Sequence, residues 1–482
     1  MAASESSALV LAKSLALVEK TKRRVAQIDG AEFPTSSSEI ARGVLGEALD
    51  TLAEKSSWSA MDPDVLYNCC LNIQSFVEQL EDSNSAHISW PLVSCCDDIW
   101  RRFFPNNDAH VFYSVTTDYN YSISRFSLRL ERLFESVLTD AQIKKILGGK
   151  NLYCLQLASV EDDNLPLYAN IGHEFGHAFL DMHEKPIRDL LNAEAKAVVA
   201  AVVAEFPQDD PDRLVELKNV TDWVIGKVAT ELFCDLVGYV ISGPAFLLSL
   251  HEVTSWGLTE AMQGVWSGAY PSHRFRAYCL SELINGSEFK AEISKLFKGL
   301  GRENLRQMAD YFSSIPTDHS GDRVSFSTFH APAEDRLLVE AAIRKHLKLL
   351  KIVLGSFLKR CWGELAPLVA KVKEFPPVPG EDVFELLLRL EGDILPNMVP
   401  DGTLLARTAS FASILNASAI YRLCVLRDKK NAASTRDVYR EVQKIERLTA
   451  KALEVSFVQR DFKAWETKMA SSSKAASSGG NV

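Results

Sequence analysis

The sequence predicts a mainly α-helical protein with a small β-sheet in its first half, and three observations carry this expectation. Apolar residues recur at helical spacing behind Ser36 and again over Ala333–Leu354. Two short stretches, His110–Thr117 and Leu152–Leu157, are rich in β-branched and aromatic residues and predict strands. A helix that carries titratable residues is expected to begin near Pro166, after the second strand. This order of strand, loop and helix is typical of a small α+β catalytic unit.

The other helices of the first half follow from the same spacing. Ser36-x-x-Glu39 is a capping-box pattern and predicts the start of a helix. A second helix is expected over Asp64–Leu80 and a third over Ser127–Leu138. Gly148-Gly149 is expected to end the segment that contains the third helix. Later in the chain, helices are expected over Cys361–Val372 and Thr435–Phe462.

These elements divide the chain into four predicted regions. Residues 1–108 form a helical region, and residues 109–290 form the α+β unit with a helical insertion at about 184–222. Residues 291–469 form a second helical domain. The remaining residues, 470–482, are mostly Ser, Ala and Gly and are predicted to be disordered.

Composition excludes several classes of partner. The 482 residues include 53 basic and 63 acidic side chains, and the net charge of −10 gives no electrostatic footprint for nucleic acid or an anionic membrane. The longest apolar run, Leu236–Leu250, contains Gly243-Pro244 and is shorter than the roughly 20 residues of a spanning helix. The nine cysteines have no framework spacing, and the N-terminus has no secretory signal. A cytoplasmic location is therefore expected.

The motif that carries chemistry is H-E-x-x-H within Gly172-His-Glu-Phe-Gly-His-Ala178. Residues four apart share one face of a helix, so His173 and His177 can present their imidazoles to one Zn²⁺ ion. Glu174 lies beside them, where its carboxylate can reach a water molecule on the metal. Since zinc lowers the pKa of such a water towards roughly 7, Glu174 is the candidate general base.

A second pair of residues supplies a candidate third ligand. Glu231-x-x-x-Asp235 lies in an apolar, helix-like stretch, and its two carboxylates share a face. Glu231 can complete the zinc coordination, and Asp235 can accept a hydrogen bond from the far nitrogen of a ligating histidine. Two carboxylates in so apolar a segment are costly unless they are paired or bound to metal.

H-E-x-x-H followed by E-x-x-x-D resembles the gluzincin metallopeptidases. The resemblance covers roughly residues 150–280 and implies a zincin-like α+β core flanked by helical domains. It implies zinc at His173, His177 and Glu231, Asp235 as a partner of His173, and a peptide or protein substrate. The interval of 58 residues from His173 to Glu231 is longer than in the compact members of the family and contains the predicted insertion.

The group that stabilises the oxyanion is less sharply indicated. Tyr270-Pro-Ser-His-Arg-Phe-Arg276 is similar to a His-Pro…Arg element that follows the third ligand in some gluzincins, with Tyr270 in the place of the His. Tyr270 or His273 can donate a hydrogen bond to the oxyanion. Arg276 can pair with Asp235 or bind the substrate.

His183 is the rival third ligand, because the metzincin pattern places its last histidine six residues after the second. That pattern has a glycine where this chain has Leu180, and a continuous helix rotates His183 away from the ligand face. Glu231 is therefore favoured and His183 is expected at the surface. Cys234 is expected to point to another helix face and to serve in packing.

The sequence therefore predicts a zinc-dependent peptidase, and two alternatives remain open. One is a non-catalytic protein that uses a zincin fold for binding or regulation, and the other is a zinc hydrolase of a non-peptide amide. The predicted strand Leu152–Leu157 is a candidate edge for an extended peptide. The helical flanks can serve as lids, as sensors or as docking surfaces for a protein partner.

Overall fold

The chain is mainly helical, as the sequence predicts, and its described residues include two small sheets, of which the sequence predicts the first. The computed structural model describes residues 2–28, 33–54, 62–84, 88, 90–104, 109–116, 121–158, 165–255, 266, 270–285, 324, 332–371, 378–402, 406–428 and 434–478. The chain divides into two compact units, Met1–Asp162 and Asp163–Val482. Within the described residues, no helix has the length and apolar character needed to cross a bilayer.

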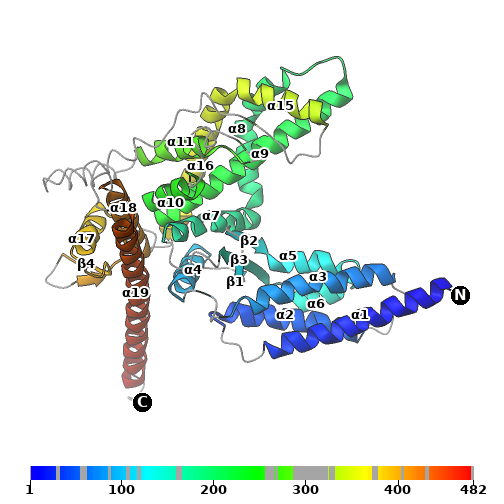
Figure 1. The fold of residues 1–482 in the computed structure, drawn as a ribbon, viewed down its shortest axis with the longest axis horizontal. Helices are drawn as coiled ribbons and strands as arrows, with labels where there is room; N and C mark the ends of the chain where they lie inside the picture. The colour runs from blue at the N-terminus through cyan, green and yellow to red at the C-terminus, as the bar shows by residue number, and fades with distance from the viewer. Residues whose placement is uncertain are drawn as a thin grey trace. The chain divides into compact units, whose positions relative to one another are not determined.

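The described part of the first unit has six helices. They are α1 (Ala2–Gln27), α2 (Ser36–Ala53), α3 (Pro63–Glu81), α4 (Trp90–Phe103), α5 (Phe126–Phe134) and α6 (Asp140–Leu147). All but α4 contribute side chains to a common apolar core. Helix α1 lies along both α2 and α3 (Figure 1). The predicted capping box at Ser36 does not form, because Thr35 is the N-cap residue and Glu39 accepts a hydrogen bond from Arg42 instead. A reciprocal capping box forms at Thr139 and Gln142, where α6 begins.

The three-stranded sheet of this unit has the order β1-β3-β2. Strand β1 (Ala109–Thr116) is parallel to β3 (Asn151–Ala158), and β2 (Ser122–Arg125) is antiparallel to it. The expectation that Leu152–Leu157 is a sheet edge is therefore wrong, because both sides of β3 are already paired. Side chains from the sheet and from α1–α3 share one core, so the predicted boundary at residue 108 falls inside this unit.

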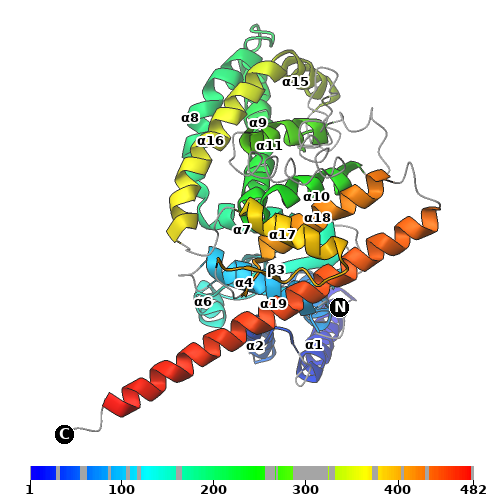
Figure 2. The ribbon, with the colours of Figure 1, turned by 90° about the vertical axis from the view of Figure 1, so that its left-hand side faces the viewer.

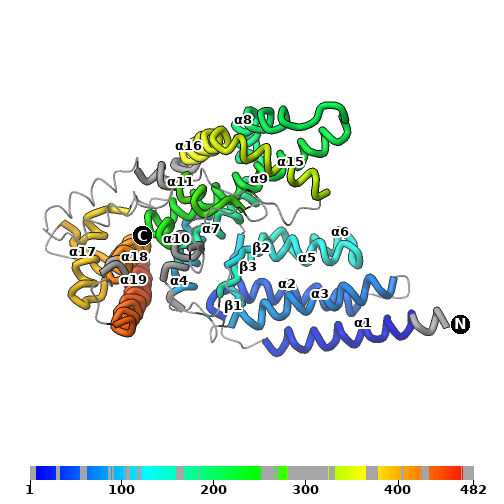
Figure 3. Tube along the Cα trace, turned by 45° about the horizontal axis from the view of Figure 1, so that its top comes forward, coloured from blue at the N-terminus to red at the C-terminus, as the bar shows by residue number. Residues whose placement is uncertain are grey.

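The second unit contains the helices that carry the motifs. Its elements are α7 (Leu165–Met182), α8 (Glu184–Val203), α9 (Pro211–Ser242), α10 (Pro244–Ser255), α11 (His273–Asn285), α15 (Ala333–Lys345), α16 (Leu347–Lys371), α17 (Gly380–Glu391), β4 (Met398–Pro400), β5 (Ala406–Thr408), α18 (Phe411–Asp428) and α19 (Thr435–Ser478). Helix α19 packs on α18 and extends well beyond it (Figure 2). Helix α16 lies along α8 (Figure 3).

Several predicted elements have different limits here. The run Ala333–Leu354 is two helices, α15 and α16, which divide at His346. Helix α9 is continuous from Pro211, so it joins the last part of the predicted insertion, residues 211–222, to the Glu231–Asp235 segment. Helix α19 runs to Ser478, past residue 470, where the sequence predicts a disordered tail. Most of residues 286–331 lie outside the described residues.

One polar side chain fixes the end of α9. Gly243 has φ of +64°, a value that favours glycine, and it separates α9 from α10. Asn416 of α18 bridges this break, since its Nδ2 donates to the carbonyl of Ser242 and its Oδ1 accepts from the backbone N–H of Ala245. The break between α9 and α10 thus falls at Gly243-Pro244, the pair inside the longest apolar run of the sequence.

Candidate metal centre

The two motif helices, α7 and α9, approach each other through their smallest residues. A Cβ atom on Gly172 would lie 2.8 Å from the Cα of Gly238, and one on Gly176 would lie 2.6 Å from the Cα of Cys234. Such distances leave no room for a side chain, so Gly172 and Gly176 permit the backbones to meet. The close approach brings the flanking side chains of both helices within bonding range of one another.

His173 and His177 lie together on one flank of this contact, one turn apart on α7. Their ring centroids are 5.0 Å apart with an interplanar angle of 82°. The Nδ1 atom of His173 is 2.9 Å from Oδ1 of Asp235, and its Nε2 atom is 3.3 Å from Oε2 of Glu231. His173 is therefore held at both ring nitrogens by carboxylates of α9.

Arg276 of α11 completes the support of Asp235. Its Nε atom donates to Oδ2 of Asp235 at 2.8 Å, and its Nη2 atom donates to Oδ1. Ser272 caps the start of α11 by accepting a hydrogen bond from the N–H of Phe275, which fixes the first turn that carries Arg276. The side chain of Asp235 has no exposed surface and that of Arg276 is 11% exposed, so this ion pair lies in the interior.

These contacts separate the pKa values of the two histidines. Burial lowers the pKa of His173, but hydrogen bonds to Asp235 and Glu231 outweigh burial and raise it to about 9. Burial and the charge of His173 lower the pKa of His177 to about 4. In the metal-free protein at neutral pH, a proton on His173 thus occupies the position between carboxylates that a cation would take.

The carboxylates are held in their ionised forms. Burial raises the pKa of Asp235, but Arg276 and His173 outweigh that effect and lower it to about 2. Burial likewise opposes ionisation of Glu231, and its contact with His173 and the nearby charges lower its pKa below the usual value. Among the described residues, Oε2 of Glu231 has no hydrogen-bond partner of good geometry. An ionised, buried oxygen without a partner beside two imidazoles suits a metal cation.

Cys234 is the second candidate for the third donor. In the described residues, one potential ligand atom from each of His173, His177 and Cys234 lies within 4.8 Å of the others. The expectation that Cys234 faces away from the histidines is therefore wrong. Burial raises the pKa of the Cys234 thiol well above its usual value. A neutral thiol is a poorer zinc ligand than the ionised carboxylate of Glu231.

The other candidate residues of the sequence differ in their burial and in their distance from the donors. Glu174 is half-buried, and its charge and that of Glu231 both raise the pKa of Tyr270, so the Tyr270 phenol lies within electrostatic range of both carboxylates. Tyr270 is 56% exposed, whereas His273 is buried as the first residue of α11. His183 follows the end of α7 and stacks on Phe179 with 4.4 Å between ring centroids. It is half-buried and does not belong to the donor group.

The donors present fit a zinc ion by their chemistry. Two imidazoles, one of them neutral, and an ionised carboxylate are the kinds of donor that catalytic zinc sites use, while the group of mutually close donor atoms among the described residues contains Cys234 and not Glu231. Comparisons with protein-family models, with curated proteins and with solved structures give no match. The interpretation of the site therefore rests on its own residues.

Proposed function

We propose that this chain is a zinc-dependent metallopeptidase in which His173, His177 and Glu231 bind the metal. The observation that supports it most is the ionised, buried Oε2 of Glu231, which lies 3.3 Å from Nε2 of His173 and has no hydrogen bond of good geometry among the described residues. The order H-E-x-x-H and E-x-x-x-D, which resembles the gluzincins, supports a peptide bond as the substrate. A zincin-like arrangement of this region is part of the same proposal.

The residues around the donors have distinct tasks in this mechanism. Zinc, when bound, polarises the scissile carbonyl and makes a water molecule acidic enough to lose a proton near neutral pH. The Glu174 carboxylate accepts that proton as the water attacks, and then delivers it to the nitrogen of the departing amine. Tyr270, whose phenol stays protonated, donates a hydrogen bond to the oxyanion.

Asp235 and Arg276 act through His173 as positioning residues. The hydrogen bond from Nδ1 of His173 to Asp235 fixes the ring so that Nε2 faces Glu231. Arg276 holds the Asp235 carboxylate from its other side and keeps it ionised. The pair therefore presets the orientation of one ligand before metal arrives.

The test is hydrolysis of a quenched fluorescent peptide library by the zinc-loaded full chain and by its Glu174→Gln variant. We expect Glu174→Gln to retain zinc and to lose about 10²–10⁴-fold in hydrolysis rate, because only the base is removed. Glu216→Gln, at an exposed position of α9, makes the same chemical change and is expected to cleave as the wild type does.

Each other outcome has a definite meaning. Cleavage at an unchanged rate by Glu174→Gln contradicts the mechanism. A zinc-loaded protein that cleaves no peptide but hydrolyses small amides points to the non-peptide alternative. Zinc binding with no hydrolysis of either substrate class points to a binding or regulatory protein built on the same metal site.

A further inference from the structure

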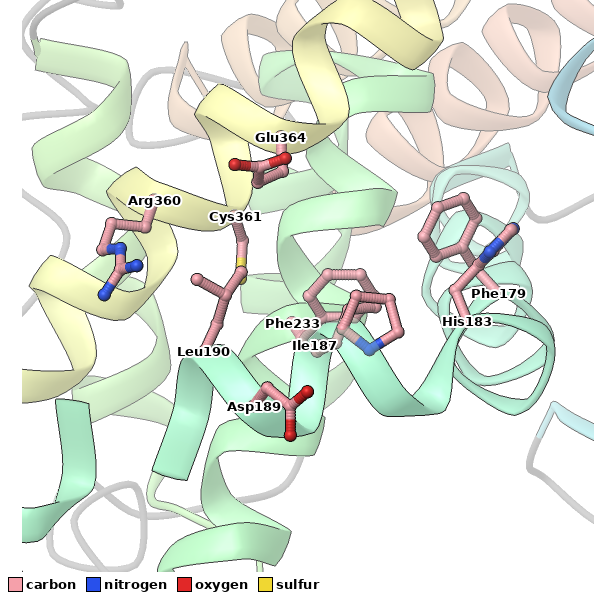
Figure 4. A pocket seen from close by; sticks show the side chains of 10 residues that line it. Phe179, His183, Ile187, Asp189, Leu190, Phe233, Arg360, Cys361 and Glu364 are labelled. Atoms are coloured by element: carbon pink, nitrogen blue, oxygen red, sulfur yellow. The ribbon is translucent and has the colours of Figure 1, made fainter. Parts of the chain in front are cut away.

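A cavity of about 480 Å³ lies among the C-terminal end of α7 and helices α8, α9 and α16. Its innermost side chains are apolar and buried: Phe179 of α7, Phe233 of α9 and Cys361 of α16. Ile187 and Leu190 of α8 extend this apolar wall (Figure 4). The volume falls within the range of roughly 300–1,000 Å³ that small-molecule sites occupy.

This cavity is distinct from the candidate metal centre, although α7 and α9 contribute to both. Two residues of an α-helix correspond to a rotation of about 200°, so Phe179 points away from the flank that carries His177. The same rotation separates Phe233 from Glu231 on α9. The rings of Phe179 and Phe233 lie 6.0 Å apart between centroids, and together they line the cavity on the flank opposite the metal donors.

The rim of the cavity is acidic. Asp189 of α8 and Glu364 of α16 lie at opposite sides of the opening (Figure 4), and both are exposed. Arg360 is the cation of the rim, and its Nη1 atom donates to Glu194 at 2.5 Å. Asp189 and Glu364 are the acidic side chains of the lining, and Glu194, which engages Arg360, does not line the cavity. Burial lowers the pKa of His183, which therefore adds no positive charge near neutral pH.

We propose that this cavity binds a small apolar amine, with its hydrocarbon part against Phe179 and Phe233 and its ammonium group between Asp189 and Glu364. The two rim carboxylates favour a cation at the opening, and the buried apolar wall favours a hydrocarbon tail. An anionic ligand of the same shape is repelled by the two rim carboxylates, while Arg360 is already engaged by Glu194.

The test uses two probes of matched shape, 4-phenylbutylamine and 4-phenylbutyrate, titrated into the full chain by ligand-observed NMR and calorimetry. We expect the amine to bind and the carboxylate not to bind. The double variant Asp189→Asn/Glu364→Gln is expected to weaken the amine about tenfold, and Ile187→Trp is expected to abolish binding by filling the cavity. The double variant Asp212→Asn/Glu216→Gln removes two exposed charges of α9 that lie outside the cavity and is expected to change nothing.

Equal binding of both probes, or amine binding that survives Ile187→Trp, overturns the proposal. The Asp189→Asn/Glu364→Gln variant changes only exposed side chains, so a weaker affinity in it does not reflect misfolding. The metal site is tested separately, because Glu231→Ala is expected to bind the amine as the wild type does. A variant that has lost zinc should therefore still bind the amine. A protein that does not bind the amine can still bind zinc.

Discussion

Two arginine–carboxylate pairs, one in each unit of the chain, lie in opposite environments. In the first unit, Arg24 of α1 contacts Glu81 and Gln74 of α3 at the margin of an apolar core, where the Arg24 and Glu81 side chains are 28% and 38% exposed. In the second unit, the side chains of Arg276 and Asp235 are 11% and 0% exposed and contact His173. The Arg24–Glu81 pair stays near water, and the Arg276–Asp235 pair lies inside.

This difference fits our proposal that the second unit carries the metal site. A buried ion pair adds little net stability, because desolvation of both charges offsets their attraction. The first unit shows that this chain can build a core without such groups. We propose that the interior position of Arg276 and Asp235 reflects a requirement of the site, which is to orient His173 and keep Asp235 ionised.

The largest expected effect comes from breaking the interior pair. Asp235→Asn leaves the Arg276 charge buried without its carboxylate and is expected to lower the free energy of unfolding by about 3–5 kcal/mol. Glu81→Gln at the margin of the first unit is the matched change and is expected to cost at most about 1 kcal/mol. Urea unfolding of the metal-free variants measures both. Equal losses of unfolding free energy in Asp235→Asn and Glu81→Gln would mean that the buried and the exposed ion pair do not differ in their energetic environment.

A smaller effect is expected where α7 and α9 meet. Gly176→Ala places a Cβ against the Cα of Cys234 and is expected to cost about 1–3 kcal/mol and to weaken zinc binding, since the helices must move apart. Gly226→Ala on α9 meets no atom within 4 Å and is expected to stabilise the protein by about 0.5–1 kcal/mol. Thermal unfolding and zinc titration test the pair. A Gly176→Ala protein with unchanged zinc affinity would contradict the role given to this contact.

The smallest effect concerns helix caps in the first unit. Thr139→Ala removes the capping box of α6 and is expected to cost about 1 kcal/mol. Ser36→Ala is expected to be nearly neutral, because Thr35 is the N-cap residue of α2. Urea unfolding measures the loss of stability in each variant. A larger loss for Ser36→Ala than for Thr139→Ala would mean that the capping box predicted at Ser36 does form.

What the sequence could predict depends on the range of the interactions involved. Helical spacing is local, so it indicates that His173 and His177 share a face and that Glu231 and Asp235 do. The position of Cys234 depends on how α7 crosses α9, which Gly172 and Gly176 set through contacts more than 50 residues away in the chain. Gly172 and Gly176, which lie in the motif segment, are the residues from which this close approach could have been predicted.

The sheet gives a second example of this limit. Strand β3 has the composition of a strand, and that property is local. Its central place depends on β2, a strand of four half-buried residues that carries no strong pattern of its own. The continuity of α9 through the predicted insertion likewise has no local marker after its N-cap at Asp210.

Zinc content of the purified full chain tests the central claim most directly, with measurements on wild type, His177→Ala, Glu231→Ala, Cys234→Ser and His183→Ala prepared without stray metal. We predict about one zinc per chain in the wild type, in Cys234→Ser and in His183→Ala, and a loss or strong weakening in the other two variants. Zinc retained by Glu231→Ala but lost from Cys234→Ser would assign the third ligand to the cysteine. A wild-type protein that binds no zinc would contradict the metal site itself.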